Sequence, residues 1–194
     1  MPSLIPVTSA RLGDHLPLLE LLPDNAPLTW VRGGDGLVGW GNYASTVVKG
    51  ANRFADARTW WHQQLEKFAF ADSVHASGTG PILFTSFSFD PDEESVLVIP
   101  QIVVGMRNGS SWITWIGDQA QPKLAESAQT LEDAEYNWGD GSLSPAEWQI
   151  RVAQAIKEIE STKLEKVVLA RDLKINSHRA IDPRKILRNL SAEY

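Results

Sequence analysis

The sequence predicts an α+β fold that combines antiparallel hairpins with amphipathic helices. Two pairs of β-prone runs surround tight turns, one at Gly33-Gly34-Asp35-Gly36 and one at Asn108-Gly109. Two other stretches, 53–69 and 145–160, repeat apolar residues every three or four positions, which is typical of a helix with one buried face. Since tight turns join antiparallel neighbours, we expect a mostly antiparallel sheet with flanking helices.

Composition limits the partners that this chain can have. Its 194 residues suit one ordinary domain. Lys and Arg number 18 against 24 Asp and Glu, so the net charge is −6, which argues against binding to nucleic acid or to an anionic membrane. We therefore expect neither a nucleic-acid partner nor a membrane partner.

The cytoplasm is the expected compartment. The chain contains no cysteine, so it can form neither a disulfide framework nor a thiolate metal site. Its first residues lack the pattern of a signal peptide, and no stretch approaches the ~20 apolar residues of a membrane span.

The first half of the chain predicts a hairpin, a helix and a strand, in that order. Residues 28–40 form the hairpin around the glycine-rich turn. The amphipathic helix 53–69 follows, with Asn52 as its cap. A strand then runs from 81 to 89, where its aromatic residues alternate, and it ends at the acidic turn 90–94, which we interpret as a solvated turn.

A second hairpin and a long connection follow. The Val- and Ile-rich run 95–106 and the run 111–116 are joined by Asn108-Gly109, a dipeptide that favours the positive φ angles of a two-residue turn. Residues 118–140 are polar and lack sustained periodicity, so we expect a connection with one short helix near 122–135. The eight tryptophans of the chain are expected to fill its core.

The strongest local signal is the start of the helix 145–160. Ser144-Pro145-Ala146-Glu147 combines a serine cap, a proline at the first helical position and a glutamate at the third, which is a capping box. The apolar face of this helix is Trp148, Val152, Ala155, Ile156 and Ile159. A strand over 165–175 and a second helix over 183–194, capped by Asp182, complete the chain.

Lys166 is the candidate catalytic residue. It stands at the head of a β-forming apolar run, where burial would disfavour its charged form, lower its pKa and allow it to act as a base. In strand geometry it shares one face with Val168, Ala170 and Asp172. The alternative is a solvated charge at the start of a strand.

The segment Lys166-Val-Val-Leu-Ala-Arg171 resembles the signature strand of the chorismate-utilising enzymes, and among them most closely the isochorismate synthases. The similarity includes the preceding helix from Pro145 to Ile159, the connection Ser161-Thr162-Lys163-Leu164 and the helix start Asp182-Pro183. The run from Thr29 to Gly41 is also similar to the amino-terminal region of these enzymes.

The resemblance implies a fold and a mechanism. The family fold consists of two large antiparallel sheets with helices outside, and its substrate is chorismate. In isochorismate synthases the matching lysine, here Lys166, is the general base that takes a proton from water. The water attacks C2 of chorismate, a glutamate acid assists loss of the C4 hydroxyl, and Mg2+ holds the substrate carboxylate. Relatives that use ammonia lack this lysine, so Lys166 favours isochorismate or salicylate as the product.

The resemblance also implies that residues 1–194 are the amino-terminal portion of a larger enzyme, which serves menaquinone or siderophore synthesis. The catalytic acid and the Mg2+ ligands belong to a carboxy-terminal half that nothing here resembles. We therefore expect an inactive chain, a Lys166 that is more exposed and less perturbed than in the complete enzyme, and self-association through an uncovered apolar face near 165–175 or 183–194. The alternative is a non-catalytic α+β module that binds a ligand or a protein.

Overall fold

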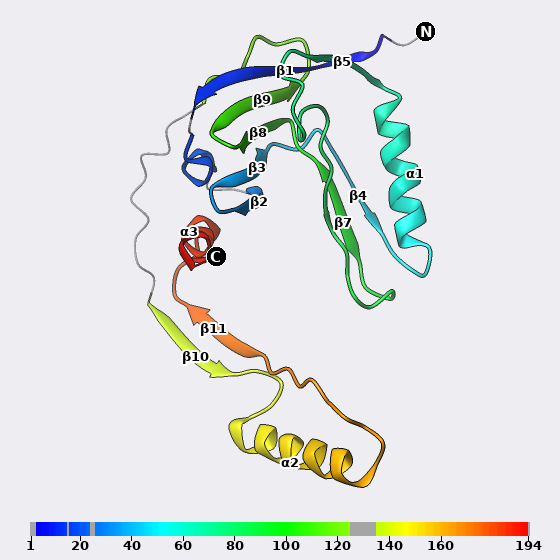
Figure 1. Ribbon diagram of the computed structural model, residues 1–194, viewed down its shortest axis with the longest axis vertical. Helices are drawn as coiled ribbons and strands as arrows, with labels where there is room; N and C mark the ends of the chain where they lie inside the picture. The colour runs from blue at the N-terminus through cyan, green and yellow to red at the C-terminus, as the bar shows by residue number, and fades with distance from the viewer. Residues whose placement is uncertain (1–2, 15, 24–25, 125–134, 194) are drawn as a thin grey trace. The chain divides into compact units, whose positions relative to one another are not determined.

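The computed structural model describes residues 3–14, 16–23, 26–124 and 135–193. It divides into two compact units (Figure 1). Unit 1 comprises Met1–Gln129 and Asp182–Tyr194, and unit 2 comprises Thr130–Ile181. In the part of the chain that the structure describes, no helix is long and apolar enough to cross a membrane.

Unit 1 is built on a six-stranded sheet with the order β2-β3-β8-β9-β1-β5. The strands are β1 (Ile5–Asp14), β2 (Leu28–Arg32), β3 (Asp35–Trp40), β5 (Phe68–Asp72), β8 (Ile102–Arg107) and β9 (Ser110–Ile116). All neighbouring pairs are antiparallel except β1 and β5, which are parallel. The mostly antiparallel α+β fold is thus confirmed.

A second sheet of three antiparallel strands, in the order β4-β7-β6, completes the strands of unit 1. These are β4 (Ala44–Val48), β6 (Phe84–Ser86) and β7 (Ser95–Ile99), and helix α1 (Arg53–Leu65) lies beside β4. Val7, Ile99 and Ile116 form a buried cluster against which Trp60 and Trp61 pack. This cluster joins β1 and β9 of the larger sheet to β7 of the smaller one.

The main core of unit 1 lies on the larger sheet. Its buried members are Leu18, Leu22, Val38, Val104, Met106, Ile113 and Trp115. The short 3-10 helix η1 (Leu18–Leu21) and helix α3 (Pro183–Glu193) contribute to it, the latter through Leu187. Burial of this apolar surface is the main stabilising term for the unit.

Both predicted hairpins are confirmed. At Asn108 and Gly109 the φ angles are 51° and 79°, as a two-residue turn between β8 and β9 requires. Gly33 and Gly34 have φ angles of 57° and 87° between β2 and β3. Glycine has no Cβ and adopts this conformation without steric cost, so both turns follow directly from the sequence.

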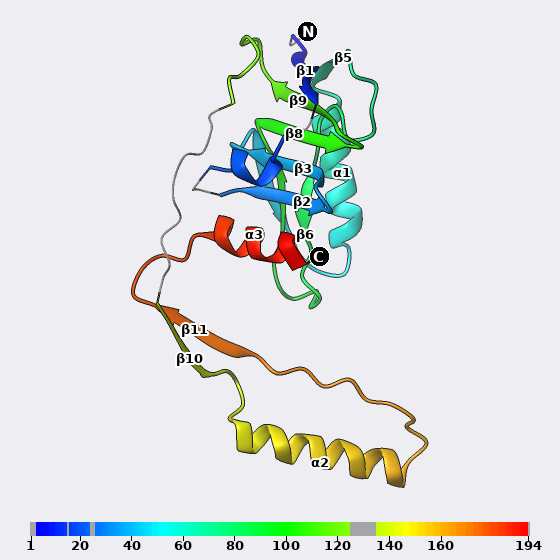
Figure 2. The same cartoon turned by 60° about the vertical axis from the view of Figure 1, so that its left-hand side comes forward.

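Unit 2 contains β10 (Tyr136–Asp140), helix α2 (Pro145–Ser161) and β11 (Leu173–Ser177). The two strands pair antiparallel, from Tyr136 opposite Ser177 to Asp140 opposite Leu173. Figure 2 shows α2 and the chain that follows it as an arm that leaves this ribbon and returns to it. None of the described residues in 135–181 is buried, so unit 2 has no core of its own.

Four predictions in the first part of the chain need correction. The helix predicted over 53–69 ends at Leu65, because Phe68 begins β5 and pairs with β1. The Asn52 side chain makes no capping hydrogen bond. The strand predicted over 81–89 shrinks to β6, since only 84–86 pair with β7. The run 95–106 is split between two sheets at Pro100, whose nitrogen carries no hydrogen for a ladder.

The second part of the chain also departs from prediction. The strand expected over 165–175 is present only as β11 from Leu173, because no described strand pairs with 165–172. The connection 118–140 ends in β10, and most of the short helix expected near 122–135 lies outside the described residues. Of the eight tryptophans only Trp112 and Trp115 are buried, while Trp30 is 71% exposed.

Candidate functional site

Lys166 lies in the segment between α2 and β11, and its side chain is exposed. The expected burial of its amine is therefore wrong for this chain, and a greater exposure than in the complete enzyme stays a prediction. The side chain is exposed because no described element of unit 2 covers the segment. No hydrogen bond or ion pair joins the Lys166 side chain to another residue in the described part of the chain.

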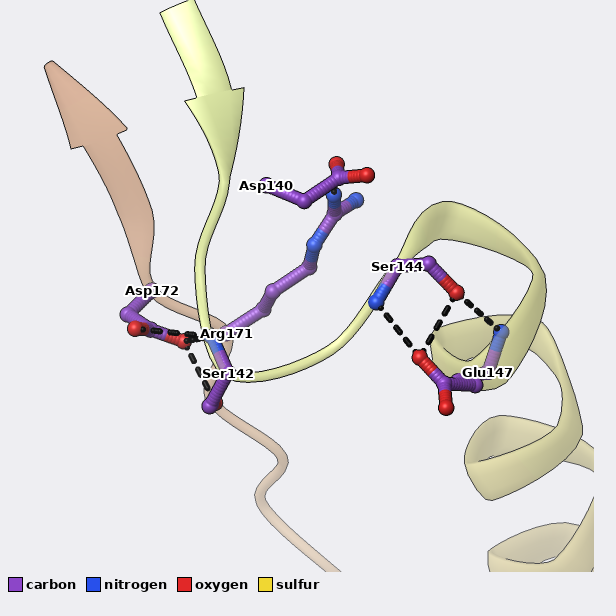
Figure 3. Close-up of polar contacts among 6 residues, drawn as sticks. All are labelled: Asp140, Ser142, Ser144, Glu147, Arg171 and Asp172. Atoms are coloured by element: carbon purple, nitrogen blue, oxygen red, sulfur yellow. Dashed lines mark hydrogen bonds and ion pairs between the residues drawn. The ribbon is translucent and has the colours of Figure 1, made fainter.

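The helix before Lys166 starts with the predicted capping box (Figure 3). The Ser144 hydroxyl accepts a hydrogen bond from the Glu147 amide at 3.3 Å. The Ser144 amide donates to Glu147 Oε2 at 2.8 Å, and the Ser144 hydroxyl lies 2.7 Å from the same oxygen. These bonds, led by that of the Ser144 hydroxyl, lower the pKa of Glu147 below its ordinary value. They fix the start of α2.

A set of hydrogen bonds between Ser142 and Asp172, the Ser142–Asp172 tie, joins Asp172 to the connection between β10 and α2. The Ser142 amide donates to Oδ1 and Oδ2 of Asp172 at 2.8 and 3.0 Å, and the Ser142 hydroxyl donates to Oδ1 at 2.6 Å (Figure 3). The hydroxyl is the main cause of a lowered pKa at Asp172, and the amide is the next. A Cβ at Gly141 would overlap both the Asp172 carboxylate and the Asp172 carbonyl. Only glycine allows this approach without a shift.

An ion pair lies beside that tie. Arg171 Nη2 donates to Asp140 Oδ1 at 3.0 Å, and the Asp140 side chain is 54% exposed. An exposed pair of this kind contributes little to stability. Together with Ser142 and Asp172, however, it holds both ends of the arm at the end of the β10-β11 ribbon. Lys166 comes six residues before Asp172, which corresponds to about 20 Å along an extended chain.

The sequence predicted Lys166 and the capping box. It missed the Ser142–Asp172 tie and the Arg171–Asp140 ion pair. Asp172 appeared only as a residue on the Lys166 face, and Arg171 only as part of the signature strand. Their partners, Asp140 and Ser142, come about 30 positions earlier, at the end of the predicted connection 118–140 and just after it. The only local feature that could have indicated this close approach is Gly141, where a Cβ would overlap Asp172.

The described residues do not fit the implied Mg2+. Among them, no group of three or more His, Asp or Glu side chains is placed to hold a metal ion. Asp140 and Asp172 are engaged by Arg171 and Ser142.

Unit 1 carries a concave surface that the sequence did not reveal. A groove of about 890 Å3 lies between the β2 edge of the sheet and α3. Trp30 and Val31 form one side and Leu187 and Leu190 the other, with Arg32 and Arg107 also lining it. The groove is mainly apolar, and its charged lining residues are Arg32, Asp35 and Arg107.

Comparison with known proteins agrees with the resemblance. The chain is 26% identical, over 185 aligned residues, to isochorismate synthase MenF of Bacillus subtilis (strain 168). The alignment covers 79% of this chain, which spans only 39% of the length of that relative. No solved structure matches the chain. The family model for chorismate binding enzymes matches residues 30–194. The chain therefore belongs to the family of chorismate-binding enzymes.

Proposed function

We propose that this chain supplies the general base of an isochorismate synthase, and that the base is Lys166. The observation that carries the proposal is a lysine at the head of the run 166–171, directly after a capped helix, in a chain of the chorismate-binding family. The similarity to an isochorismate synthase supports this reaction within the family. We place the reaction in the cytoplasm, in menaquinone or siderophore synthesis.

In the proposed reaction the neutral Lys166 amine accepts a proton from water, whose oxygen bonds to C2 of chorismate. The C4 hydroxyl leaves as water after protonation by an acid, so atoms and charge balance. Because the ordinary pKa of lysine is ~10.4, a base near pH 7 requires an amine shielded from solvent. Lys166 is exposed here, so the proposal requires a covering element from outside this chain.

We further propose that the catalytic acid and the Mg2+ ligands lie outside this chain. Catalytic groups that act as a unit lose nearly all activity when one is removed. The chain alone should thus give no isochorismate above a mock preparation. A salicylate synthase would share the same base and the same first step, so the product must be identified directly.

The test uses a protein that contains this chain together with the rest of the enzyme. Lys166→Ala should reduce chorismate turnover by orders of magnitude while the melting temperature stays nearly unchanged, since an exposed lysine contributes little to stability. Lys166→Arg should be as damaging, because a guanidinium stays protonated. Lys163→Ala, three residues earlier and also exposed, is the matched control and should keep full activity.

Two outcomes would contradict the proposal. If Lys166→Arg kept most of its turnover, the lysine would hold charge or position rather than accept a proton. If the unmodified longer protein bound chorismate but left it unchanged, the family fold would serve here as a non-catalytic module. The exposed Lys166 and the lack, among the described residues, of an acidic or histidine group that could hold a metal ion are what favour that alternative.

A further inference from the structure

Residues 163–171, here called the strap, are attached at both ends to the rest of unit 2. At the first end the Thr162 hydroxyl donates to the Glu158 carbonyl of α2 at 2.7 Å and accepts a hydrogen bond from the Leu164 amide at 3.1 Å. At the second end the Ser142–Asp172 tie holds the chain near the start of α2. The strap therefore connects the two ends of the same helix.

The strap has little slack between these two attachments. Helix α2 contains 17 residues, so it is about 25 Å long, and Ser142 comes only three positions before its first residue. The strap must return along most of that length, and Figures 1 and 2 show it as a drawn-out trace that leads back to β11. The chain from Thr162 to Asp172 measures about 33 Å when fully extended. Few conformations are open to a chain so close to its full length.

Fixed ends set the register of Lys166. The proposed function requires a covering element from outside this chain, and such an element can pair with a strand in more than one register. A slip of one residue moves each side chain by about 3.3 Å and turns it to the other face. Because the residues before and after the strap are both held, such a slip is excluded.

The Ser142–Asp172 tie is the attachment that removes the last slack. The β10-β11 ribbon by itself holds the chain only from Leu173, which pairs with Asp140. Without the tie the free segment would be one residue longer, and the added length of about 3.3 Å equals one register step. The position of Gly141 permits the contact, since a Cβ there would overlap the Asp172 carboxylate.

We propose that Ser142 and Asp172 are positioning residues that fix the register of Lys166 by closing the strap. The inference rests on the proposed function of Lys166 as a general base. Ser142 and Asp172 act only through that lysine. A displacement of about 1 Å can lower a rate on the order of 100-fold. Because the base takes its proton from water, misplacing it should lower kcat and leave the KM for chorismate nearly unchanged.

The kinetic test uses a protein that contains this chain together with the rest of the enzyme. Gly141→Ala separates Ser142 from Asp172 without removing a polar group, and it should lower kcat at least about tenfold with KM within about twofold. Gly139→Ala is the matched control and should keep full kcat, since the nearest atom to its added Cβ is 4.0 Å away. Ser142→Ala should lose less, because the amide still donates. Ser142→Thr keeps the hydroxyl and should retain most of the activity.

A double variant separates positioning from a general structural role. Lys166→Ala combined with Gly141→Ala should be no slower than Lys166→Ala alone, because the tie acts through the lysine. A further loss in the double variant, or full kcat in Gly141→Ala, would overturn the positioning role. Turnover that survives Lys166→Ala would instead overturn the proposed function, so the two failures are distinguishable.

Spin labels measure the slack directly in residues 1–194, which contain no natural cysteine. Gln154→Cys on α2 and Val168→Cys on the strap are both at exposed positions. The distribution of distances between the two labels should be narrow while both ends hold. Gly141→Ala should broaden it, and Gly139→Ala should not. Equal widths in both variants would overturn the proposal independently of any activity.

Discussion

Asp172 carries the clearest electrostatic signature in unit 2. Its carboxylate accepts three hydrogen bonds from Ser142, a residue 30 positions earlier, and these bonds lower its pKa below the ordinary value of 3.8. A carboxylate whose pKa is lowered by folding stabilises the folded state above its ordinary pKa. That contribution is lost as pH falls through the lower, folded-state value.

We therefore expect Ser142→Ala to raise the pKa of Asp172 toward 3.8, because the shortest of the three bonds is lost. Carboxyl chemical shifts followed by NMR during an acid titration measure this directly. Thr79→Ala is the control, since Thr79 donates to Asp72 at 2.7 Å in the other unit and should leave Asp172 unaffected. An unchanged Asp172 titration in Ser142→Ala would mean that the tie does not form in solution.

Glycine at 141 is required for the same contact. Gly141→Ala should separate Ser142 from Asp172, since the added Cβ overlaps the Asp172 carboxylate and carbonyl. The Ser142 amide would then exchange with solvent faster. At Gly139 the nearest atom to an added Cβ is 4.0 Å away, so Gly139→Ala should leave the exchange rate unchanged. Similar rates in both variants would show that the close approach is not maintained.

Helix α2 depends on its ends more than on packing. None of its residues is buried, so it lacks the tertiary packing of an apolar face from which most helices in proteins gain their stability. The capping box satisfies amides of the first turn that have no partner inside the helix. The helix was predicted correctly because these signals are local: a serine, a proline and a glutamate within four positions.

Ser144→Ala should accelerate amide exchange throughout α2, because the Glu147 amide loses its acceptor and the Glu147 carboxylate loses a donor. Ser161→Ala at the other end is the comparison, since its hydroxyl only donates to the Lys157 carbonyl at 2.7 Å and caps no amide. Exchange mass spectrometry resolves the two. Equal rates in both variants would remove the capping box as the determinant of α2.

Strands were predicted most accurately where a short turn joins them to their partner. Asn108-Gly109 fixes β8 against β9, and Gly33-Gly34 fixes β2 against β3. β1 and β10 were missed, because β1 pairs with strands more than 60 residues later and β10 with β11 across the whole of α2. The candidate lysine was found through a resemblance. Its exposure could not be predicted from a local pattern, since it depends on which element covers the strand.

The two units differ in how much apolar surface they bury. Unit 1 contains two hydrophobic clusters, whereas the described residues of unit 2 include no buried side chain. Local opening free energies follow buried contacts, so a segment without a core opens more readily than the global unfolding reaction.

Amide hydrogens of β10 and β11 should thus exchange orders of magnitude faster than those of β8 and β9, although both pairs are antiparallel hydrogen-bonded strands. Exchange NMR on the unmodified chain at low concentration makes the comparison without interference from association. Uniform protection of all four strands would mean that the chain unfolds as one cooperative body.

Because β1 is an interior strand of its sheet, the pairing of both its edges is completed late during synthesis. Ile5–Asp14 lies between β9 and β5, so one edge of β1 is not paired until Ile116 has left the ribosome. At ~5–20 residues per second this takes on the order of ten seconds. Throughout that interval the first strand of the chain is made but not enclosed, and Val7, which ends with no exposed surface, is in contact with water or with a chaperone. Of the six strands of this sheet, β1 is thus synthesised first, yet its second edge is paired only after β9, the last of the six, has been made.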